Sequence, residues 1–404
     1  MVHSDETNFT IDTTSGRLKI LLLTMQDPHD RRSWSGIIYY TAQALQKHCG
    51  DVSYIGSTFL TQRFLGRIFH KSMQQLLHKN FMYNHCLAVA KEYAQIVNRR
   101  LKQQAYDVII APAGATEIAF LQTDTPIVLI EDATFALLHN YYPQYSNLMK
   151  RSIDECHQVQ RAAITNASAA VYSSSWAARS AIDIYHADPQ KVHVIPFGAN
   201  LDHAPSRDLA LNARPTDCCR LLFLGVNWQR KGGDIAFETL LALRQMDIPT
   251  ELVICGCVPP KNISHPNMKV IPFLDKNDPA QYKELIQLYL ESDFLLLPSR
   301  NECFGIVFCE ASAFGLPVIT TDTGGITGAV QNNINGFTLP LAARGNEYAQ
   351  LIAQLYHDQP QYASLARTSR ATFDDKLNWD QWALVMNTIL LDVLKQKKVS
   401  LSSI

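Results

Sequence analysis

The chain has 404 residues, and this length predicts two domains because a single core rarely grows so large. Apolar residues make up 47% and charged residues 18%, a balance that is typical of a compact folded protein and excludes a largely disordered one. The formal net charge of -1 provides no overall field that would attract a polyanion, so we expect no nucleic-acid partner.

The cysteines and the first residues indicate the compartment. None of the nine cysteines forms a Cys-x-x-Cys pair of the kind that binds zinc or carries out redox chemistry, which favours free thiols in a reducing environment. The polar segment over residues 1–20 lacks the apolar core of a secretory signal, and no run approaches the roughly 18 apolar residues of a membrane span. We therefore expect a cytoplasmic protein.

Strands and helices alternate through the first half of the chain. A buried strand is predicted at the first apolar run, and a polar loop that contains Gly36 then leads into a helix ending near Gly50. The predicted strands of this half lie at residues 17–24, 52–57, 106–112, 125–132 and 169–175, with a long helix over 84–104. This alternation predicts an α/β fold with a parallel, doubly wound sheet.

The segment over residues 61–80 combines helical periodicity with positive charge and contains no acidic residue. Its apolar positions near one face are Leu65, Ile68, Phe69, Leu76 and Leu77, and its basic positions are Arg63, Arg67, Lys71 and Lys79. Such a helix either packs its apolar face against the core, which is the commoner arrangement, or lies on an anionic membrane. The second alternative would make the protein peripheral at the inner face of the membrane.

The second half repeats the alternating pattern after a loop-like linker at about 196–217. Its predicted strands lie at residues 220–226, 251–257, 268–273, 294–299 and 316–322, with helices after Gly233, from Pro279 and from Phe304. A helical run over 379–398 ends in lysines, which is typical of a closing helix. Two doubly wound domains are therefore expected, and the oligomeric state is not predicted.

A basic pair and two glycines follow the first predicted strand of the second half. Arg230 and Lys231 directly precede Gly232 and Gly233, at the point where a strand leads through a loop into a helix. Open parallel sheets bind ligands at the carboxyl ends of their strands, and helix N-terminal amides favour anions. The pattern favours a phosphate or diphosphate site, and a solvated Arg–Lys pair in a loop is the alternative.

Two carboxylates occur in an apolar context after the strand at 294–299. Glu302 falls in the loop, the pair Phe304–Gly305 is expected to form the first helical turn, and Glu310 follows about one and a half turns later. One explanation is that Glu302 provides a charge at the helix N-terminus and that Glu310 is an exposed surface acid. The functional alternative is that both acids bind a single ligand, since a carboxylate can accept paired hydrogen bonds from a ribose diol or from sugar hydroxyls.

At these residues the chain resembles the retaining GT-B-fold glycosyltransferases of the large E-x7-E family (glycosyltransferase family 4, glycosyl transferases group 1). The signature is Glu302 to Glu310 in "ECFGIVFCEASAFGLPVI", supported by "FLGVNWQRKGG", "YHADPQKVHVIPFGAN" and "WSGIIYYTAQAL". The resemblance implies two Rossmann-like domains that face a central cleft. It places an acceptor-binding domain at residues 1–200, a donor-binding domain at 201–379, and a crossover helix at about 380–404 that returns to the first domain.

The resemblance also implies an activity: transfer of a hexose, with retention, from a nucleotide diphosphate sugar to a hydroxyl of a sugar, lipid-linked or small-molecule acceptor. A UDP-sugar is favoured, with GDP-mannose next. No metal and no cofactor are implied, and no Asp-x-Asp donor-metal motif stands in a suitable loop. A non-catalytic nucleotide-sugar-binding or scaffold protein with the same fold is the alternative.

Roles of individual residues follow from the same resemblance. The catalytic group would be Glu302 on the donor sugar with Lys231 and Arg230 on the diphosphate. The residues implied in donor binding are Gly36, Arg230, Lys231, Glu302, Phe304, Gly305, Ile306 and Glu310.

The chain departs from the family pattern at two places. Val226 stands where the family often has arginine, and Arg230 is a candidate to supply that charge instead. A histidine near the donor sugar is absent from the first domain, which leaves Asp132 and His139 as candidates on the acceptor side. Asp132 is equally well explained as a cap of the following helix.

Overall fold

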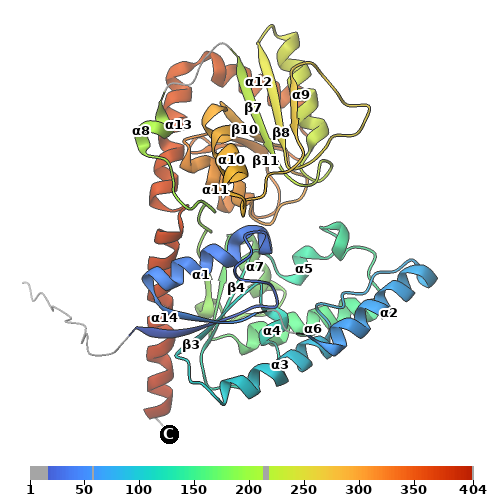
Figure 1. Cartoon of the computed structure of the whole chain (residues 1–404), viewed down its shortest axis with the longest axis vertical. Helices are drawn as coiled ribbons and strands as arrows, with labels where there is room; N and C mark the ends of the chain where they lie inside the picture. The colour runs from blue at the N-terminus through green and yellow to red at the C-terminus, as the bar shows by residue number, and fades with distance from the viewer. Residues whose placement is uncertain (1–16, 57–58, 213–217, 403–404) are drawn as a thin grey trace, which may run out of the picture.

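The computed structural model describes residues 17–56, 59–212 and 218–402. Two α/β units are stacked along the long axis of the molecule, and the C-terminal helix runs beside the lower one (Figure 1). Each unit contains one six-stranded sheet, as the alternation in the sequence predicts. The expected α/β architecture with two parallel sheets is therefore confirmed.

The first sheet has the strand order β2-β1-β3-β4-β5-β6, and every pair is parallel. Its strands are β1 (Leu18–Leu23), β2 (Gly50–Ile55), β3 (Val108–Pro112), β4 (Ile127–Glu131), β5 (Ala169–Tyr172) and β6 (Val192–Val194). The apolar runs become strands because helices cover both faces of the sheet. The helices are α1 (Ile37–His48), α2 (Thr61–Leu77), α3 (Leu87–Leu101), α4 (Ala115–Ile118), α5 (Phe135–Leu138), α6 (Lys150–Asn166) and α7 (Ser175–Asp183).

The second sheet is also parallel, with the order β12-β11-β10-β7-β8-β9. Its strands are β7 (Cys219–Leu224), β8 (Thr250–Cys255), β9 (Met268–Ile271), β10 (Phe294–Leu297), β11 (Val318–Thr321) and β12 (Gly336–Leu339). The helices are α8 (Arg207–Leu211), α9 (Gly233–Gln245), α10 (Pro279–Glu291), α11 (Ile306–Ala313), α12 (Gly345–His357), α13 (Gln359–Asp375) and α14 (Trp379–Ser402). The strand pattern missed the edge strands β6 and β12, which are short and only partly buried.

An aromatic cluster joins the two units. The ring of Phe197 stacks on Trp379 at the start of α14, at 5.9 Å between centroids, and meets Phe304 and Trp34 edge-on at 5.3 and 5.5 Å. Phe197 is fully buried, and Asn200 is as well, so the expected linker at 196–217 is wrong for its first residues. They belong to the core at the junction of the units rather than to an exposed connection.

Two helices differ from the sequence-based expectation. Helix α11 begins at Ile306, two residues later than expected, because Gly305 adopts a left-handed conformation at its N-cap (φ 86°). Helix α2 buries none of its side chains, so the expectation that 61–80 packs its apolar face into the core is wrong. Within the part of the chain that the structure describes, no helix is long and apolar enough to cross a membrane.

Candidate functional site

The central strands of the second sheet bring two loops together. Strands β7 and β10 are neighbours, and the chain leaves them toward opposite edges, β8 and β9 on one side and β11 and β12 on the other. Such a switch in strand order opens a crevice at the carboxyl ends of the strands, where ligands bind in open α/β sheets. Lys231 follows β7 and Glu302 follows β10, so both side chains originate at this point.

The charged groups of these two loops converge. The ammonium group of Lys231 donates to Oε2 of Glu302, and Nη1 of Arg230 lies 3.7 Å from the same oxygen. Both partners of the Lys231–Glu302 pair are buried. Burial lowers the pKa of Lys231, while the negative charge of Glu302 acts in the opposite direction. The structure thus joins Arg230, Lys231 and Glu302, which sequence reasoning proposed separately.

Two tyrosines from the first unit hold the Glu302 loop from across the cleft. The backbone N–H of Glu302 donates to the hydroxyl of Tyr141 at 2.8 Å, and that of Cys303 donates to the hydroxyl of Tyr142 at 3.1 Å. The guanidinium of Arg230 lies over the ring of Tyr142, 5.2 Å from its centroid. These contacts place the loop after β10 directly against the loop after α5.

Glu302 lines a cavity of about 550 Å³ between the two units. A second cavity, of about 780 Å³, lies between α1 and the start of α14 and does not include Glu302. On the side of the second unit this smaller cavity is lined by Val226, Asn227, Arg230, Glu302 and Cys303. On the side of the first unit its polar lining includes Trp34, His85, Glu131, Asp132, Tyr142, Gln144, Tyr145 and Gln160. We take the smaller cavity as the candidate active site because Glu302 and Arg230 of the converging charged groups line it.

The wall opposite Glu302 carries two adjacent carboxyl groups. Burial raises the pKa of Asp132 to about 7, and the charge of Glu302 raises it as well, while a hydrogen bond from the side chain of Trp34 lowers it. Burial raises the pKa of Glu131 to about 8, although its Oε2 accepts a hydrogen bond from Nε2 of Gln160 at 2.9 Å. Asp132 therefore faces the cavity and titrates near neutral pH.

Glu131 is expected to make the protein less stable as the pH rises. Between its ordinary pKa of 4.5 and its folded pKa of about 8, the unfolded chain has released this proton while the folded chain keeps it, so higher pH favours unfolding. Between pH 5 and 8 this effect should lower the free energy of unfolding of the wild type by about 3 kcal/mol, and replacing Glu131 by Gln should abolish that decrease, as measured by urea unfolding. The exposed Glu284→Gln variant is the control, and parallel stability curves for Glu131→Gln and the wild type would contradict the expectation.

His139, the second acceptor-side candidate, is not brought to the cavity. Its ring stacks on Phe135 with 5.8 Å between centroids, and it is absent from the described residues that line the cavity. The histidine that does line the wall is His85, whose Nδ1 lies 2.9 Å from Oγ1 of Thr116. Burial, reinforced by the charge of Arg63, lowers the pKa of His85 to about 4, so it is neutral there.

Glu310 is buried and already has partners on both of its oxygens. The hydroxyl of Tyr289 donates to Oε2 at 2.7 Å, and the ammonium group of Lys276 donates to Oε1. Lys276 comes from the loop before α10, and its backbone carbonyl accepts from Arg31 of the first unit at 3.2 Å. A ribose diol at Glu310 would therefore have to share the carboxylate with Lys276 or displace it.

The loop that carries Gly36 has an unusual backbone. Trp34, Ser35 and Gly36 all have positive φ (45°, 58° and 90°), and Gly36 caps the N-terminus of α1. The side-chain amide of Asn200 donates to the carbonyl of Ser35 at 2.8 Å and holds the loop in this form. Non-glycine residues in this region are strained and are often found at functional sites. Trp34 and Ser35 line the cavity, so this strain is located at the site.

The glycines of the loops after β7 and β11 allow close packing between loops, in addition to any close approach of a ligand. A Cβ on Gly232 would lie 2.0 Å from the carbonyl oxygen of Pro298, and one on Gly233 would meet the ring of Trp228. A Cβ on Gly325 would lie 1.9 Å from the carbonyl oxygen of Cys303. The sequence pattern located the right loops, and the structure adds a reason for the glycines, which is contact between the loops after β7, β10 and β11.

Several site residues escaped sequence reasoning. Tyr142, Gln160 and Lys276 have no motif of their own, and two of the three belong to the first unit. Trp34 and Glu131 did carry a signal, since Trp34 begins one of the supporting motifs and Glu131 precedes Asp132 at the end of a predicted buried strand.

Comparison with known proteins agrees with the geometry. Residues 212–372 match the family model described as Glycosyl transferases group 1. This part of the chain is therefore similar to the Glycosyl transferases group 1 domain. It contains Arg230, Lys231, Glu302 and Glu310 together with the loops that carry them.

A curated relative is the D-inositol 3-phosphate glycosyltransferase of Xylanimonas cellulosilytica, which is 28% identical over 250 residues. The match covers 57% of this chain and 58% of the relative, so the chain spans little more than half the length of the relatives it matches.

Solved structures match the fold over most of the chain. The sucrose-phosphate synthase of Thermosynechococcus elongatus aligns with a TM-score of 0.66 at 17% identity, covering 94% of this chain and 100% of that one. HepE of Anabaena, solved in complex with UDP-glucose, aligns with a TM-score of 0.57 at 16% identity, covering 96% and 100%. The chain therefore has the GT-B fold that its sequence indicated.

Proposed function

We propose that the protein is a retaining glycosyltransferase that moves a hexose from a nucleotide diphosphate sugar to a hydroxyl group. The observation that carries the proposal is the buried Lys231–Glu302 pair at the strand switch of the region that matches Glycosyl transferases group 1, facing Asp132 across the cavity. Residues 1–200 would bind the acceptor, and residues 201–379 would bind the donor. Helix α14, which follows the second unit and packs against α1 of the first, would join the two domains.

In the proposed reaction the bond between the anomeric carbon and the diphosphate breaks as the bond to the acceptor oxygen forms on the same face of the sugar. The acceptor oxygen is the nucleophile and its proton passes to a diphosphate oxygen, so no side chain is needed as a nucleophile or as a general base. Lys231 and Arg230 would stabilise the charge that develops on the diphosphate, and Glu302 would orient the sugar by its hydroxyls. Displacement of Glu302 from Lys231 by the donor would free the ammonium group for the diphosphate.

A UDP-sugar is the favoured donor, ahead of GDP-mannose. In this assignment Gly36 lets the diphosphate approach, Phe304, Gly305 and Ile306 offer backbone amides, and Glu310 receives the ribose hydroxyls. The complex of HepE with UDP-glucose supports this preference, because HepE binds a uridine nucleotide and has the same fold.

The chemistry of the cavity favours an uncharged acceptor hydroxyl. Glu131, Asp132 and Glu302 line the cavity, and Arg230 is the one lysine or arginine among the described residues that line it. Because Arg230 is already engaged near Glu302, a phosphate group beside Asp132 would have no cation to pair with. A sugar or polyol hydroxyl, in contrast, can donate a hydrogen bond to Asp132.

The two glutamates provide the test of the donor site. With a panel of nucleotide sugars, thermal shift should identify one donor that stabilises the chain. Glu310→Ala should weaken the binding of that donor and of its free nucleotide by about tenfold or more. Glu302→Ala should lower kcat by about a hundredfold with a smaller effect on the free nucleotide, because in this assignment Glu302 contacts the sugar of the donor and not its nucleotide.

Turnover separates the proposed enzyme from a non-catalytic binder with the same fold. Release of UDP that depends on an added hydroxyl acceptor, together with retention at the anomeric carbon of the product, would support transfer. Stabilisation by no nucleotide sugar would overturn the proposal. Equal effects of both glutamate variants on free UDP would overturn the separate roles assigned to them.

A further inference from the structure

Helix α2 presents an apolar face to the solvent. Five large side chains are at least half exposed: Phe64 (55%), Leu65 (51%), Ile68 (50%), Leu76 (72%) and Leu77 (57%). The first four are separated by three, four and eight positions, which places them on one side of the helix. Phe59, 77% exposed, precedes the helix and extends this surface. Contiguous exposed apolar surface of this kind marks an interaction site in a folded protein.

The opposite face of α2 already fixes the helix to the first unit. Nε of Arg63 donates to Oδ1 of Asn84 at 2.9 Å, and the backbone N–H of Phe81 donates to Nδ1 of His70 at 3.1 Å. The carboxylate of Glu92 accepts from the backbone amides of residues 61 and 62 and so caps the helix. The helix is therefore held in one orientation, and its apolar side is the side turned away from the chain.

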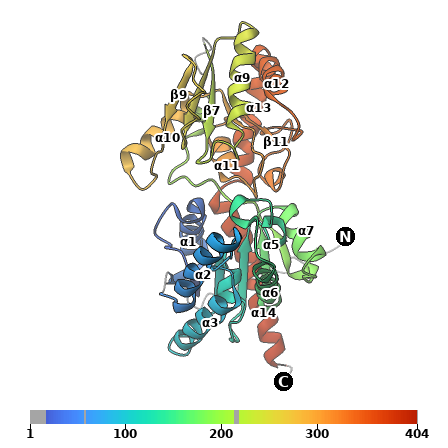
Figure 2. The same ribbon diagram turned by 90° about the vertical axis from the view of Figure 1, so that its right-hand side faces the viewer.

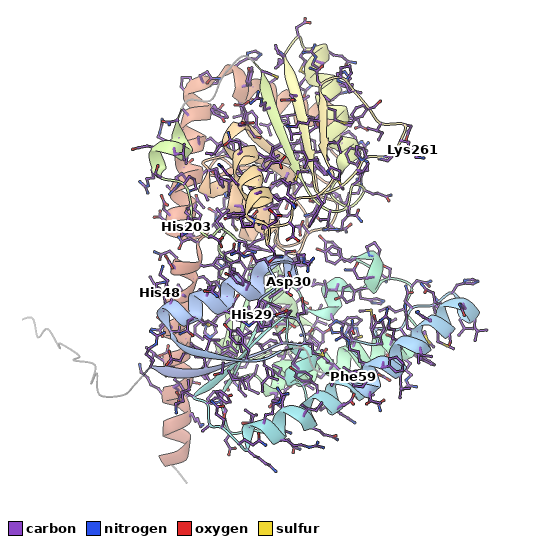
Figure 3. All side chains as sticks on the ribbon, in the orientation of Figure 1. His29, Asp30, His48, Phe59, His203 and Lys261 are labelled. Carbon is purple, nitrogen blue, oxygen red and sulfur yellow. The ribbon has the colours of Figure 1, made fainter. Side chains whose placement is uncertain are left out.

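The position of α2 leaves this side open. The helix runs along the outer edge of the lower unit on the side away from α14 (Figure 1), and it stands in front of that unit when this edge faces the viewer (Figure 2). Phe59 lies in the lower unit and far from Lys261, which is on the upper one (Figure 3). Within the ranges that the structure describes, the helix has no neighbour that buries any of its side chains.

Positive charge borders the apolar face. Arg67, Lys71 and Lys79 are exposed, and none of them has an acidic partner among the described residues at ion-pair distance. No acidic residue occurs anywhere in 61–80. A second copy of the chain docked face to face would bring these cations together, and like charges repel. An anionic surface complements both the charge and the apolar side chains.

We propose that α2 and Phe59 dock the protein on an anionic lipid bilayer, with Phe64, Leu65, Ile68 and Leu76 inserted at the boundary of headgroups and acyl chains. The cations Arg67, Lys71 and Lys79 would lie at the level of the anionic headgroups. This surface is separate from the Lys231–Glu302 site, so the proposal does not depend on the transfer reaction.

The docking surface is connected to the candidate active site. Asn80, just after α2, pairs with Leu148: its backbone N–H donates to the carbonyl of Asn147 at 2.9 Å, and its carbonyl accepts from Met149 at 3.0 Å. The segment before Leu148 contributes Gln144 and Tyr145 to the cavity wall. The segment that follows α2 is therefore paired with the segment that supplies part of the cavity wall.

Co-sedimentation with vesicles tests the proposal. The full chain should bind vesicles of phosphatidylcholine and phosphatidylglycerol in equal parts at low salt, bind pure phosphatidylcholine vesicles much more weakly, and be released by high salt. Arg67→Glu with Lys71→Glu should lower binding by about tenfold or more. Ile68→Ser with Leu76→Ser should lower it by about a hundredfold.

Matched variants on the upper unit control for general effects. Lys261→Glu with Lys269→Glu makes the same change of charge, and Val258→Ser with Leu341→Ser removes comparable exposed apolar groups. Both should bind vesicles like the wild type. All variants change exposed side chains, so thermal unfolding should be nearly unchanged.

Three outcomes would overturn the proposal. These are no binding to the anionic vesicles at low salt, equal losses in the α2 variants and the controls, and a stable dimer in sedimentation velocity that Ile68→Ser with Leu76→Ser dissociates. The last would assign the face to a second copy. None of these readouts involves nucleotide-sugar turnover, so the failure of the docking proposal and that of the proposed enzyme are distinguishable.

Discussion

Replacing Lys231 by methionine is expected to lower kcat for sugar transfer by about a hundred- to a thousandfold. Methionine keeps most of the volume of the buried side chain but removes the charge that would neutralise the departing diphosphate. The site is closed to bulk water around Lys231, so solvent cannot replace this charge. Initial rates at saturating donor and acceptor measure the effect, and a kcat within about threefold of the wild type would contradict it.

The same substitution also leaves the Glu302 carboxylate without its lysine, which by itself is expected to destabilise the fold. Arg230, 3.7 Å away, compensates in part, and a loss of about 3 kcal/mol is expected. The double variant Lys231→Met with Glu302→Gln removes both charges and should recover most of that stability. Because Glu302 is itself assigned to the donor sugar, its replacement is expected to lower kcat as well, so the double variant tests only the effect on stability. The exposed Lys269→Met variant is the control for loss of a cation.

Much of the fold followed from the sequence because its strands are buried on both faces. The run after Arg17 and the run that ends at Pro112 are rich in apolar residues and bury most of their side chains, which distinguishes a parallel sheet covered by helices from other architectures. The positions of Lys231 and Glu302 relative to their strands followed as well. Residues directly after the strands of a parallel sheet share one edge, so placing both at the ligand-binding edge needed no knowledge of side-chain packing.

What the sequence did not show depends on contacts between distant segments. Tyr141 meets Glu302 across 161 positions of the chain, and no local pattern specifies that distance. The positive φ values at Trp34 and Ser35 occur in a loop whose Ser35 carbonyl accepts a hydrogen bond from Asn200, also far away in sequence. For α2 the sequence predicts an apolar face but not its direction, because amphipathicity is the same whether that face turns inward or outward.

Replacing Gly324 by alanine is expected to damage both stability and turnover. Gly324 has φ 58°, and an added Cβ would lie 2.0 Å from the carbonyl oxygen of Glu302, a separation that no side chain tolerates. The Glu302 backbone would have to move, and with it the hydrogen bond from the Gly325 amide at 3.1 Å. We expect the free energy of unfolding to fall by about 3 kcal/mol and kcat by about a hundredfold.

Two neighbouring threonines provide matched controls for Gly324→Ala. Thr327→Ala changes an exposed side chain and should leave stability within about 0.5 kcal/mol. Thr323→Ala removes the hydrogen bonds of the Thr323 hydroxyl with the Tyr141 hydroxyl and with the carbonyl of Arg300, and should cost about 1 to 2 kcal/mol. Neither change moves the Glu302 backbone, so neither should lower kcat by more than about threefold.

An osmolyte separates the two effects of Gly324→Ala. Trimethylamine N-oxide strengthens folding in general, so it should restore the melting temperature of the variant. It cannot remove the overlap between the new methyl group and the Glu302 carbonyl, because that overlap exists in the folded state itself. The deficit in kcat should therefore persist after stability has been restored. Full recovery of kcat with the osmolyte would show that Gly324 supports only the fold and would remove the assigned link between this glycine and the position of Glu302.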